Sequence, residues 1–124
     1  MKIIISNTSN LAIYEQIVRQ IKDAVIAGDL REGEPLPSIR SLARDLQISV
    51  ITTKRAYEEL EQEGLIYPVA GKGFYVSRQN TSMLKEKRIQ MLEEELSKLA
   101  VEWKKAGLSR EDMTDYIEVL FEEL

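Results

Sequence analysis

The side chains available to this chain limit the chemistry that it can perform. It contains neither histidine nor cysteine, which removes the commonest general base, thiolate nucleophiles and the usual zinc ligands. No paired carboxylates follow a strand-like segment, and no glycine-rich segment opens a helix. The sequence therefore predicts a protein that is not an enzyme and that uses no cofactor and no metal.

Basic, hydroxyl and small side chains gather instead in two short segments. The first runs from Ser38 to Lys54, and the second is Gly71-Lys72-Gly73. Such groups bind phosphates and the edges of bases. The glycine–lysine segment does not match a nucleotide-binding P-loop, because no Ser or Thr follows the lysine and no helix is expected there. Both segments favour nucleic acid as the partner.

The net charge of −4 is compatible with that interpretation. Residues 1–78 hold ten basic and ten acidic side chains (10 − 10 = 0), whereas residues 79–124 hold seven and eleven (7 − 11 = −4). The acidic excess lies wholly in the tail, and DNA responds to the local face rather than to the total charge. No run of eighteen apolar residues and no signal-peptide cleavage site is visible, so we expect a cytoplasmic protein without a membrane span.

A first amphipathic helix is expected over residues 11–26. Asn10 precedes it as a capping residue, and Gly28 follows it as a C-terminal stop. Apolar residues recur at every third or fourth position, so one face of this helix is buried. Residues 28–37 are rich in turn formers and are predicted to form a loop.

Two shorter helices are predicted to follow the loop. Ser38 is expected to cap a helix over residues 39–46, and Ser49 to cap a helix from Val50 to about Glu63. Two short helices joined by a three-residue turn are typical of a helix-turn-helix. The start of the second helix, residues 50–55, would then enter the major groove of DNA.

A β-hairpin is predicted directly after these helices. Residues 65–69 and 74–76 are rich in β-branched and aromatic side chains, and residues 70–73 form the tight turn between them. A hairpin in this position is a wing. Residues 1–78 are therefore predicted to form a winged helix-turn-helix DNA-binding domain.

Residues 79–124 are predicted to form a domain of two amphipathic helices. The first runs from about Met83 to Ala106, and Ser109 with Asp112 resembles a capping box for the second. Their apolar stripes can pack on the first helix of the same chain or pair with a second copy. The pair is favoured, because a 46-residue tail has little else to cover them. The expected dimerisation residues are Ile89, Leu92, Leu96, Leu99, Trp103, Tyr116, Ile117, Leu120 and Phe121.

Residues 28–77 resemble the DNA-binding domain of the GntR family of bacterial regulators, and in particular its short YtrA-like branch. The resemblance is carried by a long match without gaps, which includes Gly28-Asp29-Leu30, Leu36-Pro37-Ser38-Ile39-Arg40, Arg55-Ala56-Tyr57, Gly64-Leu65-Ile66 and Gly71-Lys72-Gly73-Phe74-Tyr75-Val76. It implies a mainly α fold with a small β-wing, followed by a two-helix dimerisation tail. It also implies a transcriptional repressor that binds a palindromic operator of double-stranded DNA as a homodimer.

The expected DNA contacts come from the two helix starts and the wing turn. Ser38 would help to seat a phosphate, and Arg40 would reach a guanine, as the resemblance implies. Thr52 and Thr53 can bond phosphate or bases. Each of these residues also has an alternative role without DNA: Arg40 could bridge to an acid, Lys72 could be a solvated turn residue, and the threonines could only fill the helix surface. The full set is Ser38, Arg40, Ser49, Val50, Ile51, Thr52, Lys54, Gly71, Lys72 and Gly73.

Val50 departs from the family, which often carries arginine at that position. Val50 and Ile51 cannot donate hydrogen bonds but can pack on thymine methyl groups, so we expect half-sites that contain thymine and one guanine. The competing function is a protein-interaction module, since winged helices also serve as adaptors. The tail is too short for a separate ligand-binding domain; the sequence identifies no effector and would place one near Trp103 or Tyr116.

Overall fold

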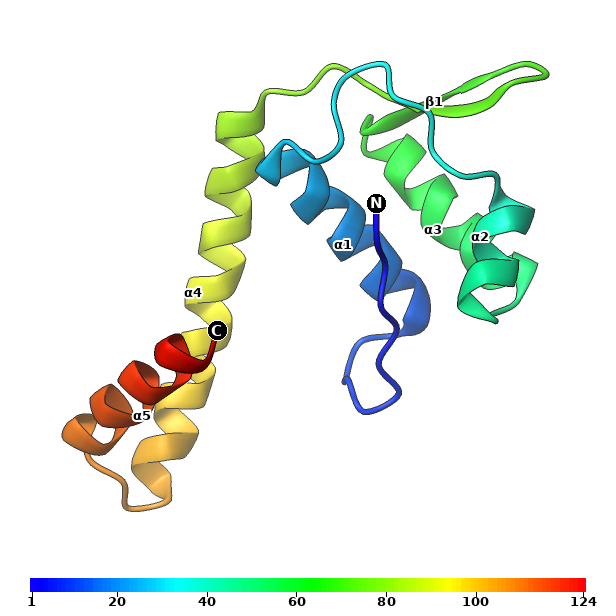
Figure 1. Ribbon diagram of the computed structural model, residues 1–124. Helices are drawn as coiled ribbons and strands as arrows, with labels where there is room; N and C mark the ends of the chain where they lie inside the picture. Colours follow the sequence, from blue (N-terminus) through cyan, green and yellow to red (C-terminus); the bar gives the residue numbers. More distant parts are fainter. The chain divides into compact units, whose positions relative to one another are not determined.

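Five helices and a two-stranded antiparallel sheet make up the computed structural model, which describes all residues, 1–124. This confirms the prediction of a mainly α fold with a small β-wing. The chain divides into two units, Met1–Leu84 (unit 1) and Lys85–Leu124 (unit 2) (Figure 1). The sequence predicts a boundary at residue 78, and unit 1 extends to Leu84. None of the helices is long and apolar enough to span a bilayer.

α1 (Ile13–Ala27) begins after Ala12, and Asn10 does not cap it. The preceding residues lie along the helix instead. The Gln16 side chain accepts a hydrogen bond from the Ser6 N–H (2.8 Å) and donates one to the Ser6 carbonyl (2.9 Å). Gln20 makes the same pair of bonds with Ile4, at 2.9 and 2.7 Å. The predicted cap at Asn10 is wrong: α1 begins two residues later than expected, and the Gln16 amide donates to the carbonyls of Ser6 and Leu11 on either side of Asn10.

α2 (Ile39–Leu46) and α3 (Val50–Gln62) form the predicted helix-turn-helix. The Ser38 hydroxyl accepts a hydrogen bond from the Ser41 N–H (3.1 Å), and the Ser49 hydroxyl accepts one from the Thr52 N–H (3.0 Å). Both predicted serine caps are therefore confirmed. Between the helices Gln47 takes the left-handed conformation (φ 55°), which turns the chain sharply.

β1 (Ile66–Val69) and β2 (Gly73–Val76) form the predicted hairpin, in a register that pairs Tyr67 with Tyr75. The loop before α2 borders this hairpin. Pro35 bridges to Tyr75, and the Leu36 N–H donates to the Phe74 carbonyl at 2.9 Å. The sequence does not predict this third extended segment, because a proline-rich loop carries no strand pattern.

The hydrophobic core lies wholly in unit 1. Every buried apolar side chain falls between Ile3 and Val76, and α3 supplies three that are fully enclosed, namely Ala56, Tyr57 and Leu60. α3 packs against α1, α2 and β1, so the helix that carries the candidate reading residues is also the centre of the domain. Burial of this apolar surface is the main driving force for folding.

α4 (Thr81–Lys105) and α5 (Arg110–Glu123) are joined by a short turn, and α5 folds back along the second half of α4 (Figure 1). The Asn80 side chain accepts from the Met83 N–H at 3.2 Å, so α4 starts at Thr81 rather than near Met83. The predicted Ser109–Asp112 capping box is confirmed, with both of its hydrogen bonds present. Neither helix contains a buried residue.

Candidate DNA interface

The starts of α2 and α3 have the same local construction. Each follows an exposed, extended serine cap, and the first two N–H groups of a helix have no partner within it. The helix dipole adds partial positive charge at the same place. Two such starts within one helix-turn-helix provide two positions suited to phosphate oxygens.

Arg40, in the first turn of α2, is exposed and makes no ion pair. The alternative in which Arg40 bridges to an acid therefore finds no support. Lys54 on α3 lies 3.8 Å from Glu58, but both side chains are more than half exposed. Such a pair contributes little to stability and leaves the lysine available for a phosphate.

The aliphatic pair at the start of α3 is open to solvent. Val50 is 47% exposed and Ile51 is 81% exposed. An isolated apolar side chain on a surface needs no explanation, but these two stand beside polar and basic groups on one helix end. Their position fits a contact with an apolar group of a partner.

Three hydroxyl groups at this helix start have different environments. Ser49 donates to the Thr52 hydroxyl at 2.8 Å, which leaves the Thr52 O–H free to donate outward. Thr53 is fully buried, and its hydroxyl donates to the Ser49 carbonyl at 3.1 Å. The prediction that Thr53 can bond DNA is therefore wrong. Although Thr53 directly follows Thr52 in the sequence, its side chain lies on the face of α3 that packs into the core.

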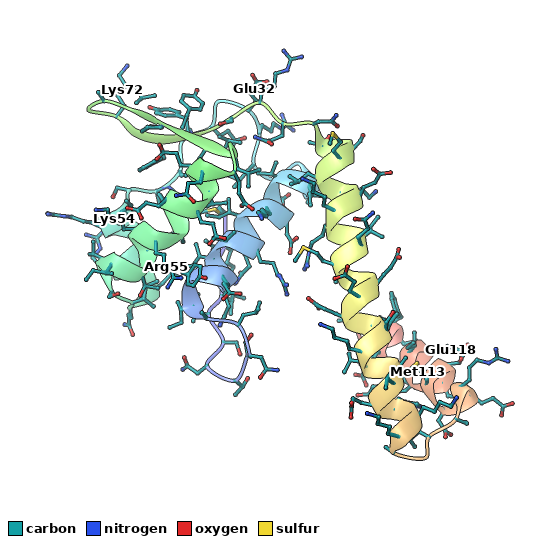
Figure 2. The ribbon with its side chains drawn as sticks, turned by 180° about the vertical axis from the view of Figure 1, so that it is seen from behind. Glu32, Lys54, Arg55, Lys72, Met113 and Glu118 are labelled. Atoms are coloured by element: carbon teal, nitrogen blue, oxygen red, sulfur yellow. The ribbon has the colours of Figure 1, made fainter.

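Arg55 follows Lys54 in the sequence but takes a different direction. Its guanidinium lies 3.9 Å from the ring centroid of Tyr14 on α1, a cation–π contact. Figure 2 shows Lys54 extending outward from α3, whereas Arg55 lies against α1. The sequence places Arg55 among the residues expected to enter the groove, and no local signal distinguishes it from Lys54.

The hairpin turn places Lys72 at the tip of the wing (Figure 2). The Lys72 N–H donates to the Val69 carbonyl at 2.9 Å, and Gly71 and Gly73 both have positive φ, 74° and 93°. A side chain at either glycine position would strain the backbone. Lys72 is exposed and makes no ion pair, so it is the one charge that this tip presents.

Aromatic side chains on the wing were not among the predicted site residues. Tyr67 stacks on Tyr75, with ring centroids 6.0 Å apart, and Tyr67 is 42% exposed. The period-two pattern of the two strands could have placed both rings on one face. The ring of Phe74, on the opposite face of β2, meets Tyr57 in the core edge-on at 5.3 Å.

Acidic side chains are absent from the first half of α3. Glu58, Glu59 and Glu61 all lie in its second half, and Glu63 beyond its end pairs with Lys22 of α1 at 2.9 Å. The charge of α3 is therefore divided, with the cation and hydroxyl groups at the start and the carboxylates at the end. An anionic partner is favoured only at the start.

The geometry of unit 1 agrees with a comparison to known families. The family described as "Bacterial regulatory proteins, gntR family" matches residues 13–76, from the start of α1 to the end of β2. This chain belongs to the GntR family. It is a DNA-binding transcriptional regulator of that family, and its recognition as a YtrA-like member is confirmed by two of the relatives described next.

Three similar proteins show how much of the chain the similarity covers. The transcriptional repressor YtrA of Bacillus subtilis is 36% identical over 109 residues, which cover 88% of this chain and 84% of YtrA. A transcriptional antiterminator from Listeria monocytogenes is 31% identical, with a TM-score of 0.71 over 97% of this chain and 90% of the relative. YtrA from Sulfolobus acidocaldarius, a GntR-family transcription factor, is 35% identical, with a TM-score of 0.59 over 73% of this chain and 96% of the relative.

Proposed function

We propose that this regulator represses transcription by binding a palindromic DNA operator as a homodimer. The observation that carries the proposal is that the chain exposes two surfaces of opposite character. Unit 1 exposes a polar and basic surface at two helix starts and a hairpin tip. Unit 2 exposes long apolar stripes on α4 and α5. The first surface suits DNA, and the second suits another copy of the chain.

The proposed reading surface is the set of unit 1 residues at the two helix starts and the wing tip. Arg40 is assigned to a guanine, because a free guanidinium at a helix start can bond the O6 and N7 edge. Val50 and Ile51 are assigned to thymine methyl groups, and Lys72 to the minor groove or its phosphates. The reading surface comprises Ser38, Arg40, Ser49, Val50, Ile51, Thr52, Lys54, Gly71, Lys72 and Gly73.

The proposed dimer surface lies on α4 and α5. Along α4 the apolar positions 89, 92, 96, 99 and 103 are separated alternately by three and four residues, which is the spacing of a helix-packing seam. Leu99 is 64% exposed and Phe121 is 73% exposed, values that a stable monomer rarely shows over a continuous stripe. Trp103 is partly covered, since its indole N–H donates to the Ser109 carbonyl and its ring lies 6.2 Å from Tyr116. The dimer surface comprises Ile89, Leu92, Leu96, Leu99, Trp103, Tyr116, Ile117, Leu120 and Phe121.

The two surfaces support each other in this proposal. One helix-turn-helix contacts only a few base pairs, and two-fold pairing doubles the site and makes it palindromic. The acidic excess of the tail also disfavours contact of unit 2 with DNA. The name of the Bacillus subtilis relative, a repressor, supports repression as the outcome of binding.

A protein-binding adaptor is the second candidate, and the exposed Val50–Ile51 pair is the observation that favours it. An adaptor surface of this kind would retain its partner when basic groups are removed. A DNA-reading surface would lose affinity and base preference together.

Selection of binding sites from a random duplex pool tests these assignments. The purified protein is expected to enrich a symmetric sequence with thymine-containing half-sites and one guanine per half. Arg40→Ala should lose the guanine requirement and bind the selected operator about 10- to 100-fold more weakly. Arg44→Ala is the matched control, because Arg44 lies on the same helix but outside the reading surface.

Three other outcomes would contradict parts of the proposal. Failure to enrich any sequence at moderate salt favours the adaptor. Enrichment of a single asymmetric half-site contradicts the dimer. An unchanged guanine requirement in Arg40→Ala contradicts the assignment of Arg40 while leaving the rest in place.

A further inference from the structure

Tyr57 joins the three parts of the reading surface from inside the domain. It belongs to α3, three residues after Lys54, and its side chain is fully buried. Its hydroxyl donates to the Pro37 carbonyl at 2.7 Å, twenty residues away in the sequence. Pro37 directly precedes Ser38, the cap of α2, so this bond ties α3 to the start of the helix that carries Arg40.

The ring of Tyr57 reaches the wing at the same time. It meets Phe74 of β2 edge-on, with centroids 5.3 Å apart and planes at 84°. The Phe74 carbonyl in turn accepts a hydrogen bond from the Leu36 N–H at 2.9 Å. The dipeptide Leu36–Pro37 is therefore held from two sides, by the wing backbone and by the Tyr57 hydroxyl. Phe74 and Tyr57 also contact each other, so α2, α3 and the wing are linked in one closed set of contacts.

The hydroxyl has no other role in the core. Phenylalanine would fill nearly the same space, and a buried hydroxyl is costly unless it is bonded. Burial raises the pKa of the Tyr57 phenol far above its ordinary value, which favours the neutral form that donates a hydrogen bond. The bond to Pro37 is thus the one contribution that tyrosine adds over phenylalanine at this position.

We propose that Tyr57 is a positioning residue for DNA recognition, whose hydroxyl fixes the start of α2, and with it Arg40, relative to the recognition helix α3. The proposal goes beyond the contact residues and rests on the proposed function, because base preference is one of its readouts. Tyr57 itself does not reach DNA. Its effect is expected at the base pair assigned to Arg40 and not at those assigned to Val50 and Ile51.

The first test needs no DNA. Amide hydrogen exchange of the intact protein is compared between wild type and Tyr57→Phe, well below the melting temperature of both. The Leu36 and Ser41 N–H groups, which bond Phe74 and Ser38, are expected to exchange about 3- to 10-fold faster in the variant, the range set by one net hydrogen bond. Helices α4 and α5 should be unchanged. Equal exchange at Leu36 and Ser41, or a uniform increase over the whole of unit 1, overturns the proposal.

The second test measures base discrimination on the selected operator. Tyr57→Phe should lose about 3- to 10-fold of the preference for the guanine assigned to Arg40 and keep its preference at the thymine positions. In an Arg40→Ala background the same change should have almost no further effect. Tyr14→Phe is the control, because it removes the hydroxyl of another unit 1 tyrosine that makes no hydrogen bond. Equal loss at all base pairs, or losses that multiply in the double variant, overturns the proposal.

The two tests separate the proposal from the function on which it rests. If wild type enriches no sequence, the proposed function fails, and the exchange measurement still decides whether Tyr57 holds the start of α2. If wild type reads an operator and Tyr57→Phe reads it equally well at every base pair, the function stands and the positioning role is overturned.

Discussion

Units 1 and 2 differ in where their apolar side chains lie: unit 1 buries many of them, whereas unit 2 leaves them exposed. Unit 1 encloses side chains such as Ile17, Ile21 and Leu60 completely, and it exposes polar and basic groups at its helix starts. Unit 2 encloses none, and α4 and α5 leave Leu99 and Phe121 largely open. The difference shows that amphipathic periodicity alone does not make a core. Unit 1 has enough elements to cover its apolar faces, whereas two helices in unit 2 do not.

The largest effect is expected when a charge is placed on the exposed apolar stripe of α4. Leu96 is 52% exposed, so Leu96→Glu should have little effect on a lone chain. In a paired surface it buries two unpaired carboxylates, and we expect the dissociation constant of the dimer to rise at least about a hundredfold. Sedimentation velocity at several concentrations measures the change, and operator affinity should fall with it.

The matched control for that experiment is Lys98→Gln, which changes the charge by the same amount two positions away. A control that dissociates equally would show that net charge, not the apolar stripe, sets the assembly. A chain that stays in one state in both variants would contradict the dimer surface.

The core of unit 1 should respond to loss of volume where its surface does not. Leu60→Ala removes a fully buried side chain and should lower the free energy of unfolding by about 2–5 kcal/mol. Ile51→Ala removes similar bulk from a side chain that is 81% exposed and should change it by less than about 0.5 kcal/mol. Chemical denaturation followed by circular dichroism measures both. Equal losses would mean that Ile51 is covered in solution.

Much of this comparison could be predicted from the sequence. The serine caps at Ser38 and Ser49 and the Ser109–Asp112 capping box are confirmed, because each depends on residues within one helical turn. Such features can be predicted from the sequence because both partners of each hydrogen bond lie within a few residues of each other.

The features that could not be predicted from the sequence all depend on contacts between distant residues. Asparagine is a residue type that often caps helices, but α1 begins after Ala12 and not after Asn10. The Gln16 and Gln20 side chains bond Ser6 and Ile4, which precede Asn10. Arg55 and Lys54 are adjacent cations, and what distinguishes them is the cation–π contact of Arg55 with the ring of Tyr14 on α1. Pro35 joins the wing although nothing nearby in sequence indicates a strand. In each case the deciding partner lies far along the chain.

A smaller effect is expected at the tip of the wing. Lys72→Ala should reduce the salt dependence of operator binding by about 0.9 in the log–log slope for each phosphate that the lysine neutralises. The measurement is the dissociation constant from fluorescence anisotropy over a series of salt concentrations. Lys98→Ala, in unit 2, should leave the slope unchanged. If the slope of Lys72→Ala equals that of wild type, Lys72 neutralises no phosphate and is only a solvated turn residue.

The smallest expected effect is a pH dependence in unit 2. The Asp112 carboxylate accepts the Ser109 N–H at 2.9 Å, and this bond lowers the pKa of Asp112 below its ordinary value. A lowered pKa in the folded state stabilises the fold above the ordinary value, and the contribution is lost as the pH falls through the lowered one. Asp112→Asn should therefore flatten the acid side of the stability profile of α5, read from the Ser109 amide by NMR. The control is Asp115→Asn, one turn further along the helix, which should leave that profile as in wild type. If both variants give the same profile, the Asp112 carboxylate has no capping role.

The glutamine pair that holds the N-terminus has a geometric consequence. Four residues of an α-helix advance about 6 Å along its axis, and two residues of an extended chain advance about 6.7 Å. Side chains at Gln16 and Gln20 can therefore pair with Ser6 and Ile4 almost in step. Glutamine amides at this interval on a helix can take both backbone hydrogen bonds of every second residue in a segment that runs beside it. The first residues of this protein are ordered in that way, by a repeat distance that two kinds of secondary structure nearly share.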